Sequence, residues 1–357
     1  MQISIAGAGM AGLVAAARLR ELGADVAVRE KGPRLGGSML LSSCVVWRHR
    51  EFDQFRAECP GGDERLQRLV WERLDDAIDW LVGRGAPVVW EETGNPRTVG
   101  KRFDPPGLVA ALAGETELVA DGLADGPLIL CTGGFAASSE LVARFVAPAA
   151  PLRLRASPWS EGDGLRFAVD RGAALTGGME EFYGRNMPDA AWGEGELVSL
   201  SQLYARYARI FDEDGAEFFA RADVSWSETN VVQATARRPG AKAYYVLDEE
   251  ALQQRVRDRT VAEMVESAPP EARISLEQLP FDPPPGAVAA VRVVASITHT
   301  VGGLRVDERA RVLREDETPV EGLWAAGVDA GAVATGGYAS GLAQALVLGL
   351  AAAEDAA

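Results

Sequence analysis

The chain has 357 residues, enough to bury one large or two moderate domains, and its 47% hydrophobic and 25% charged composition is typical of a soluble globular protein. A net charge of −16 and a pI near 4.7 argue against nucleic acid or an anionic membrane as the main partner, while indicating nothing about a substrate. Three cysteines, odd in number and far apart, predict a reducing cytoplasm and no disulfide framework, and two histidines without a CxxC motif make a zinc site improbable.

The two ends of the chain give no sign of membrane insertion. The apolar start lacks a basic segment and predicts a strand and a glycine turn, not a signal peptide. The apolar run from Ala339 to Ala353 is too short to span a bilayer. We therefore expect a cytoplasmic protein, and the preference for arginine over lysine, together with the high alanine content, suggests a GC-rich bacterial gene.

The first thirty residues predict a nucleotide-binding unit. An apolar run over residues 2–6 leads into Gly7-Ala8-Gly9-Met10-Ala11-Gly12, and a helical pattern over 13–22 and a short strand over 25–29 follow. In such a unit the first glycine allows the tight turn, the second lets backbone approach a pyrophosphate, and the third lets the helix pack on the sheet. Glu30 lies where a carboxylate accepts hydrogen bonds from the adenosine ribose hydroxyls. The whole pattern predicts dinucleotide binding.

The remaining elements follow in chain order. We expect a glycine-rich loop over 31–38, an amphipathic helix over 63–82, a strand at 88–90, a loop over 94–106 and a helix over 107–113. A buried strand at 128–131 precedes a helix that Ser160 caps and Gly172 stops. Later we expect a helical stretch at 249–266, a proline-rich linker at 280–286, renewed strands from Val291 and a final helix from Ser340.

This order predicts an α/β fold in which a Rossmann-like domain is split by an inserted α+β capping domain. The expected boundaries are 1–178 and 291–357 for the nucleotide-binding domain and 179–290 for the capping domain.

Four segments resemble, in order, the fumarate reductase / succinate dehydrogenase flavoprotein family, which includes soluble fumarate reductases, tricarballylate dehydrogenases and 3-ketosteroid dehydrogenases. They are GAGMAGL…AVREKGPRLGGS (7–38), LILCTGGF (128–135), EGDGLRFAVDRGAAL (161–175) and ITHTVGGLRVDERARVL…GLWAAG…SGLAQALVLG (297–349). The resemblance implies non-covalent FAD. It also implies several strands before residue 128, where this chain has room only for one hairpin or strand.

The resemblance assigns cofactor contacts along the whole nucleotide domain. It implies contacts from Gly7, Gly9, Met10, Ala11, Gly12, Glu30, Lys31, Gly36, Gly37, Ser38, Cys44, Val45, Thr132, Gly133, Gly134, Asp163, His299, Gly327, Asp329, Ser340, Gly341 and Leu342. The last helix should point its N-terminus at flavin N1 and the C2 carbonyl, where its dipole stabilises the anionic reduced flavin. Cys44 departs from the family pattern, which has glycine at this position. It is either a small buried hydrophobic residue or a redox thiol. Asp163 is either a flavin contact or a helix cap.

The substrate residues of the fumarate-type members are missing. Their proton-donor arginine, substrate histidine and second arginine fall at Ser225, Thr298 and Gly336. Because guanidinium groups clamp carboxylates, we reject succinate, fumarate and tricarballylate as substrates. The steroid branch has a tyrosine before the last helix, and Tyr338 lies two residues nearer that helix than the family's tyrosine.

Several side chains remain open candidates. Tyr338 is either a catalytic residue or packs over its loop, and His299 is either a base or a cofactor contact. The run Arg48-His49-Arg50 either holds an anionic group or is a solvated turn. A further set either forms the core of the capping domain or lines an apolar pocket: Tyr183, Arg185, Trp192, Tyr204, Tyr207 and Trp226.

We therefore expect an FAD-dependent oxidoreductase that transfers hydride between flavin N5 and an activated C–C bond of a non-dicarboxylate, apolar or aromatic, carbonyl-containing small molecule. Tyr338 or His299 would handle the proton. An FAD-dependent oxidase or tailoring enzyme of secondary metabolism and a non-catalytic electron-transfer module remain the alternatives. The electron partner and the oligomeric state are left open by the sequence.

Overall fold

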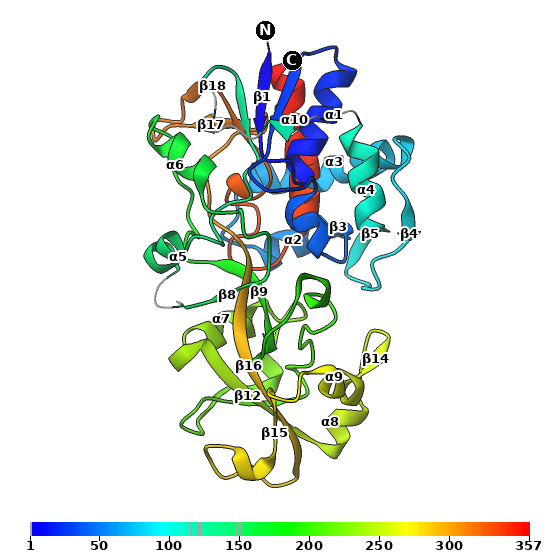
Figure 1. Cartoon of the computed structure of the whole chain (residues 1–357), viewed down its shortest axis with the longest axis vertical. Helices are drawn as coiled ribbons and strands as arrows, with labels where there is room; N and C mark the ends of the chain where they lie inside the picture. Colours follow the sequence, from blue (N-terminus) through cyan, green and yellow to red (C-terminus); the bar gives the residue numbers. More distant parts are fainter. Residues whose placement is uncertain are drawn as a thin grey trace. The chain divides into compact units, whose positions relative to one another are not determined.

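The computed structural model describes residues 2–114, 116, 118, 119, 123, 125–146, 149 and 151–357. The chain forms two compact units (Figure 1). Unit 1 comprises residues 1–138, 156–181 and 299–357, and unit 2 comprises 139–155 and 182–298. The predicted boundaries differ from these at residues 179–181, which belong to unit 1, and at residues 139–155 and 291–298, which belong to unit 2. Both stretches lie there since the strand at 153–154 pairs with the strand that ends the insertion.

Unit 1 is built on a six-stranded Rossmann-like sheet, as predicted. Five strands are parallel, and β17 at the edge is antiparallel to β18. In spatial order the strands are β17 (Arg311–Leu313), β18 (Pro319–Ala325), β7 (Leu128–Leu130), β1 (Ile3–Ala6), β2 (Val26–Arg29) and β6 (Leu118–Val119). Strands from the early and late parts of the chain therefore belong to one sheet, on either side of β7, which confirms the split α/β domain.

Of the predicted reduced meander, the structure describes only β6 as a strand, and β6 pairs in parallel with β2. The rest of that prediction falls partly on residues 115, 117, 120–122 and 124, which lie outside the described residues.

The helices α1 (Met10–Glu21) and α10 (Gly341–Ala356) contact each other (Figure 1). Helix α3 (Glu64–Gly83) packs on α10, and α4 (Pro105–Ala113) packs on α1. The predicted helices at 63–82 and from Ser340 are confirmed as α3 and α10, and the side chains of Asp63 and Ser340 cap them. The other helical segments are α2 (Phe52–Glu58), α6 (Asp163–Val169) and the short 3₁₀ helices η1 (Gly37–Leu41) and η6 (Gly327–Asp329).

Two local predictions in unit 1 are wrong. The expected loop at 94–106 contains β5 (Thr98–Phe103), the middle strand of an antiparallel sheet with β3 (Val45–His49) and β4 (Val88–Trp90). Ser160 does not cap α6, because the N-cap residue is Gly162 and the Ser160 carbonyl accepts the N–H of Ala137.

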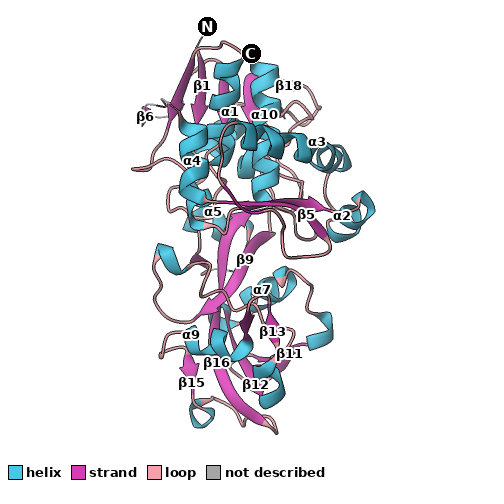
Figure 2. Ribbon diagram, turned by 90° about the vertical axis from the view of Figure 1, so that its right-hand side faces the viewer, coloured by secondary structure: helices cyan, strands magenta, loops and turns pink. Residues whose placement is uncertain are grey.

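Unit 2 is built on a seven-stranded sheet around the long strand β16, whose neighbours β9 and β12 are also visible in Figure 2. Its strands are β8 (Arg153–Leu154), β9 (Phe182–Pro188), β10 (Arg209–Phe211), β11 (Glu217–Phe219), β12 (Lys242–Asp248), β15 (Arg273–Ile274) and β16 (Ala287–Thr300), the last two residues of which belong to unit 1. The predicted linker at 280–286 is wrong, because this segment precedes β16 inside unit 2.

The helices of unit 2 are short. The helical stretch predicted over 249–266 is two helices separated by a hairpin, in which Arg257 has a left-handed backbone (φ +58°). The helical and hairpin segments are α5 (Ser139–Phe145), η2 (Glu194–Glu196), η3 (Arg221–Asp223), α7 (Thr229–Ala236), η4 (Pro239–Ala241), α8 (Glu249–Gln253), β13 (Arg255–Val256), β14 (Arg259–Thr260), α9 (Val261–Ser267) and η5 (Leu276–Gln278).

Candidate functional site

The turn between β1 and α1 combines two glycines that the fold needs with one that it does not. A Cβ at Gly7 would collide with the Cys131 carbonyl oxygen, and a Cβ at Gly12 would collide with the Gly7 carbonyl oxygen. A Cβ at Gly9 would meet nothing within 4 Å. Gly9 is the N-cap of α1 without a side-chain cap, so the first N–H groups of the helix, including those of Met10 and Ala11, face this space. The turn is thus suited to a phosphate group.

The loop that begins η1 lies against the same space. The Gly36 N–H donates to the Ala8 carbonyl at 2.7 Å, and a Cβ at Gly37 would lie 3.3 Å from the Gly9 Cα. Ser38 Oγ accepts the Ser157 N–H at 3.0 Å. Two glycine-rich backbones therefore approach each other closely where the pyrophosphate is predicted.

Glu30 and Lys31 stand at the end of β2. The Glu30 carboxylate accepts the N–H groups of Ala8 (2.7 Å) and Gly32 (2.6 Å), which ties the fingerprint turn to the loop after β2. Lys31 pairs with Glu161 and with Asp163, the latter at 2.9 Å. Burial lowers the pKa of Lys31, but these carboxylates outweigh that effect and the pKa is raised. Asp163 is the first residue of α6 and does not cap it.

The loop after β7 is held by a buried carboxylate. Asp329 in η6 accepts the N–H of Thr132, the Thr132 hydroxyl (2.9 Å) and the N–H of Gly134 (3.0 Å). Burial raises the pKa of Asp329, although these donors oppose the shift. Gly133 and Gly134 both have positive φ, of 89° and 72°. Because Asp329 is directed at protein donors, its role in the structure is to position the loop.

Gly327 and the segment before β3 complete the backbone of the site. A Cβ at Gly327 would lie 3.1 Å from the Cβ of Ala11, so this glycine lets η6 lie close to α1. Cys44 has a left-handed backbone (φ +53°), is fully buried and directly precedes Val45, the first residue of β3. Burial raises the pKa of the Cys44 thiol to about 12, and the charge of Asp104 contributes. A thiol with that pKa behaves as a small hydrophobe.

The start of α10 lies beside the imidazole of His299. Ser340 Oγ accepts the Ala343 N–H at 3.2 Å, while the N–H groups of Gly341 and Leu342 have no intrahelical acceptor. His299 Nε2 lies 3.2 Å from the position of a Cβ on Gly341. His299 Nδ1 donates to the Thr300 carbonyl at 3.1 Å, because a carbonyl can only accept. Burial lowers the pKa of His299, so the ring is neutral with Nε2 unprotonated.

Thr300 is a site residue that sequence reasoning missed. Its Oγ1 is buried without a hydrogen-bond partner within the described part of the chain. It lies 2.7 Å from the position of a Cβ on Gly134. An orphaned buried hydroxyl beside a glycine loop is a polar group whose hydrogen bonding the described chain leaves unsatisfied. The signal was present in the Thr298-His299-Thr300 run, but that run by itself does not say which threonine faces inward.

Tyr338 is held by two residues of β3. Its ring lies 5.2 Å from that of Trp47, and its carbonyl accepts from His49 Nε2 at 3.2 Å. His49 is buried, and burial lowers its pKa, so it is neutral. The arginines beside it are engaged: Arg48 binds Asp75 at 2.6 Å, and Arg50 Nε donates to the Pro96 carbonyl at 3.2 Å.

Comparison with known protein families shows which family the chain belongs to. An FAD-binding-domain family model matches residues 106–342, about two thirds of the chain, and an NAD(P)-binding Rossmann-like model matches residues 5–59. The chain belongs to the FAD-binding family of fumarate reductase-type flavoproteins. It is an FAD-dependent oxidoreductase, and the predictions of family, cofactor and enzyme class are confirmed.

The flavoprotein resembles members of two branches of the family. A probable fumarate reductase, Ifc3, from Shewanella frigidimarina is 20% identical over 93% of this chain and 70% of the relative. The open conformation of a flavocytochrome c3 fumarate reductase matches 99% of this chain and 78% of that chain (TM-score 0.73, 19% identity). The 3-ketosteroid-Δ4-(5α)-dehydrogenase from Rhodococcus jostii RHA1, in complex with 4-androstene-3,17-dione, matches 99% of this chain and 96% of that chain (TM-score 0.72, 18% identity). At these identities the solved structures show the fold alone.

The residues of unit 1 fit FAD. The open space at Gly9, which no protein contact requires to be glycine, and the orphaned hydroxyl of Thr300 are the observations that test this fit. Within the described residues, no group of three or more His, Cys, Asp and Glu side chains could hold a metal ion. Among the same residues, no helix is both long and apolar enough to cross a membrane.

The three positions of the missing dicarboxylate residues have local roles in this flavoprotein. The Ser225 N–H donates to Asn230 Oδ1 at 3.1 Å, and Thr298 Oγ1 accepts from Arg155 at 3.1 Å. Gly336 has a φ of +91°, and its N–H donates to Glu181 at 2.7 Å. An arginine at 336 would be strained by that backbone conformation.

The polar side chains of unit 2 form two buried clusters of their own. Glu228 has a left-handed backbone (φ +57°), is buried, and accepts the Ala205 N–H at 3.1 Å. Burial raises the pKa of Glu228 to about 7, although the charge of Arg185 opposes the shift. Tyr204 is fully buried in the core, and Tyr207 packs against it, so these two of the aromatic set are core residues.

The second cluster surrounds Asp189, whose carboxylate receives three cations: Arg153 (2.5 Å), Arg292 (2.8 Å) and Lys242 (2.9 Å). Burial raises its pKa, but Lys242 and Arg292 outweigh that effect and the pKa is lowered.

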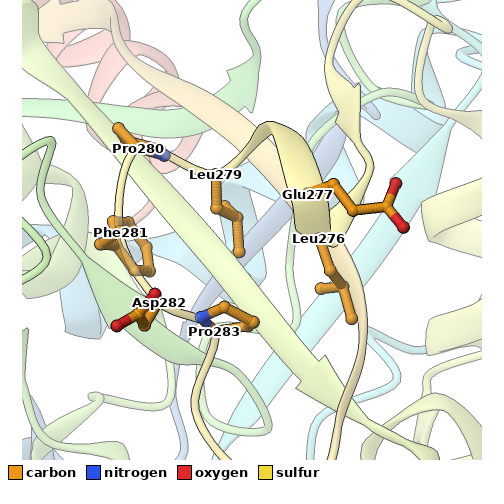
Figure 3. Close-up of a pocket in the computed structure, with 7 residues that line it drawn as sticks. All are labelled: Leu276, Glu277, Leu279, Pro280, Phe281, Asp282 and Pro283. Atoms are coloured by element: carbon orange, nitrogen blue, oxygen red, sulfur yellow. The ribbon is translucent and has the colours of Figure 1, made fainter.

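An open hollow in unit 2 lies outside the flavin site. Its volume is about 480 Å³, and one continuous segment, residues 276–283, forms it (Figure 3). Leu279 belongs to a small core cluster that also contains Phe211 and Tyr244. None of its lining residues belongs to unit 1.

Proposed function

We propose that this flavoprotein catalyses α,β-dehydrogenation, or the reverse alkene reduction, next to a carbonyl group of an apolar or aromatic substrate that is not a dicarboxylate. The observation that carries the proposal is the neutral imidazole of His299 at the start of α10. A neutral imidazole can accept a proton from the carbon α to a carbonyl, and the positive end of the helix dipole would stabilise the negative charge left on the substrate.

When bound, FAD supplies a two-electron acceptor for the hydride of the β carbon. The N–H groups of Gly341 and Leu342 and the dipole of α10 stabilise negative charge at their end of the helix. The Thr300 carbonyl accepts the Nδ1 proton of His299 and so orients the imidazole ring. Tyr338, held through Trp47 and His49, is the second candidate for the proton.

The choice of substrate class rests on the side chains of the chain itself. Ser225, Thr298 and Gly336 offer no guanidinium or imidazole for a carboxylate, and Gly336 has a backbone that favours glycine. The likeness to a 3-ketosteroid dehydrogenase in complex with 4-androstene-3,17-dione supports a carbonyl-containing apolar substrate. A cytoplasmic, bacterial origin and a small molecule as the partner belong to the same proposal.

Anaerobic stopped-flow spectroscopy of the FAD-loaded protein tests the proposal. We expect flavin reduction by a saturated cyclic ketone or 3-ketosteroid, or reoxidation of the reduced flavin by the matching enone, and no response to succinate or fumarate. Fast turnover of succinate or fumarate would overturn the choice of substrate. Absence of any reduction across a broad ketone panel would favour the non-catalytic module, whereas rapid oxygen consumption with substrate would favour the oxidase.

The role of His299 has a separate test. His299→Gln should retain FAD and slow flavin reduction by roughly a hundredfold, because general base catalysis contributes about 10²–10⁴. Since the pKa of His299 is lowered, the base form persists below pH 6.5, and the wild-type rate should stay flat down to that pH. Tyr338→Phe is the matched variant, and a larger loss there than in His299→Gln would move the proton-handling role to Tyr338.

A further inference from the structure

Trp159 exposes a large aromatic surface beside the predicted ribose contact. Its side chain is 41% exposed. A Cβ at Gly32 would lie 2.7 Å from Trp159 Cδ1, 3.0 Å from Trp159 Nε1 and 3.0 Å from Glu30 Oε1. The indole and the Glu30 carboxylate therefore converge on the same point next to the Gly32 backbone.

The indole is held in this position by the chain around it. The N–H of Glu161 donates to the Trp159 carbonyl at 3.0 Å, and the Glu161 side chain pairs with Lys31. Lys31 also binds Asp163 at 2.9 Å. The segment that carries Trp159 is thus tied by ion pairs to the residue before Gly32. The φ of Gly32 is not in the left-handed region, so the lack of a side chain there serves to admit the indole.

We propose that Trp159 is the aromatic platform on which the adenine of FAD stacks. The proposal rests on FAD binding, which the family establishes, and does not depend on the reaction. Glu30 is placed for the ribose hydroxyls, and adenine is attached directly to that ribose, so the purine leaves the sugar next to the indole. A purine face stacks well on an exposed indole, and such stacking typically changes affinity by roughly ten- to hundredfold.

The consequence is a preference for cofactors that contain adenosine. FMN and riboflavin have the same isoalloxazine ring but no adenine, so the indole should contribute to FAD and ADP binding and nothing to FMN binding.

Titration of the deflavinated full-length chain with FAD, FMN and ADP, followed by calorimetry, tests the proposal. Trp159→Ala should weaken FAD and ADP binding by tenfold or more and leave FMN binding unchanged, and Trp159→Phe should restore most of the loss. Trp90→Ala is the matched control, because Trp90 is 44% exposed on β4 and should change none of the three affinities. In the wild type, ADP should also quench tryptophan fluorescence more than it does in Trp159→Phe.

Gly32→Ala keeps the tryptophan and displaces the indole, so it should reproduce the loss of ADP affinity and covers the case in which Trp159→Ala does not fold. Unchanged FAD affinity in folded Trp159→Ala would overturn the proposal, as would an equal loss of FMN affinity. Because every readout is a binding constant, these outcomes are independent of whether any ketone reduces the flavin.

Discussion

The two units of the chain differ in what keeps their residues in place. In unit 1 the backbone sets the positions of the family motifs: close packing requires glycine at positions 7 and 12, whereas a Cβ at Gly9 would meet no protein atom within 4 Å. In unit 2 the positions where the family resemblance predicts dicarboxylate-binding residues carry other side chains with their own local partners, as at Ser225 and Thr298. At the cofactor site the backbone therefore limits which residue types a position accepts. Substrate choice depends instead on side chains that can be replaced one at a time.

The largest expected effect separates the two kinds of glycine in unit 1. Gly12→Ala should lower the free energy of unfolding by about 3 kcal/mol or more, because its Cβ has no room. Gly9→Ala should leave the unfolding of the FAD-free chain within about 1 kcal/mol of wild type, since nothing lies within 4 Å of the new Cβ. The same variant should weaken FAD binding by a hundredfold or more. Urea unfolding measures the change in stability, and FAD titration measures the change in affinity. If Gly9→Ala destabilised the FAD-free chain as much as Gly12→Ala, Gly9 would also be required by packing.

The next effect concerns the buried carboxyl of unit 2. The folded-state pKa of Glu228, about 7, lies above its ordinary value of 4.5, so the folded chain holds a proton that the unfolded chain releases. The stabilisation is complete below pH 4.5 and is lost as the pH rises through 7, by at most about 3 kcal/mol. Glu228→Gln should remove this slope in urea unfolding between pH 5 and pH 8. Glu321→Gln, at an exposed position, serves as the control and should keep it.

A smaller loss is expected at the other cluster of unit 2. Asp189→Asn should destabilise the chain by about 2 kcal/mol, because three cations lose their common partner but remain about a third exposed and screened by solvent. Since the pKa of Asp189 is lowered, its contribution is present at neutral pH and is lost as the pH falls below 3.8. The loss of stability as the pH falls should therefore be smaller in Asp189→Asn than in the wild type. A wild-type midpoint in Asp189→Asn at pH 7 would contradict this role.

The smallest expected effect is at Cys44, where a glycine variant should be at least as stable as an alanine variant. Its left-handed backbone costs about 1 kcal/mol for a residue other than glycine. We expect Cys44→Gly to be at least as stable as Cys44→Ala, against the usual order of these residues in regular structure. Thermal unfolding of the two variants measures the difference. In the native wild type, burial should also protect the thiol from a disulfide reagent.

The parts of the fold that could be predicted are those coded by neighbouring residues. The turn from 7 to 12, the helices at 63–82 and after Ser340, and the alternation of strand and helix follow from local spacing, and the structure agrees. The strand β5 was missed because Gly100 and its polar neighbours give no apolar alternation, and its partners β3 and β4 supply the pairing. The positioning role of Asp329 toward Thr132 depends on a contact across 197 residues, which spacing cannot reveal.

The contact between Asp329 and the loop after β7 bears on how the protein is made. The ribosome delivers the fingerprint turn long before Asp329, and α10, which packs on α1, comes after both. A nascent chain that ends before residue 329 has the fingerprint turn but lacks the carboxylate that holds the loop after β7. We therefore expect FAD to bind only after residue 329 has been made, and truncation before that residue to remove the nucleotide site while the fingerprint turn remains.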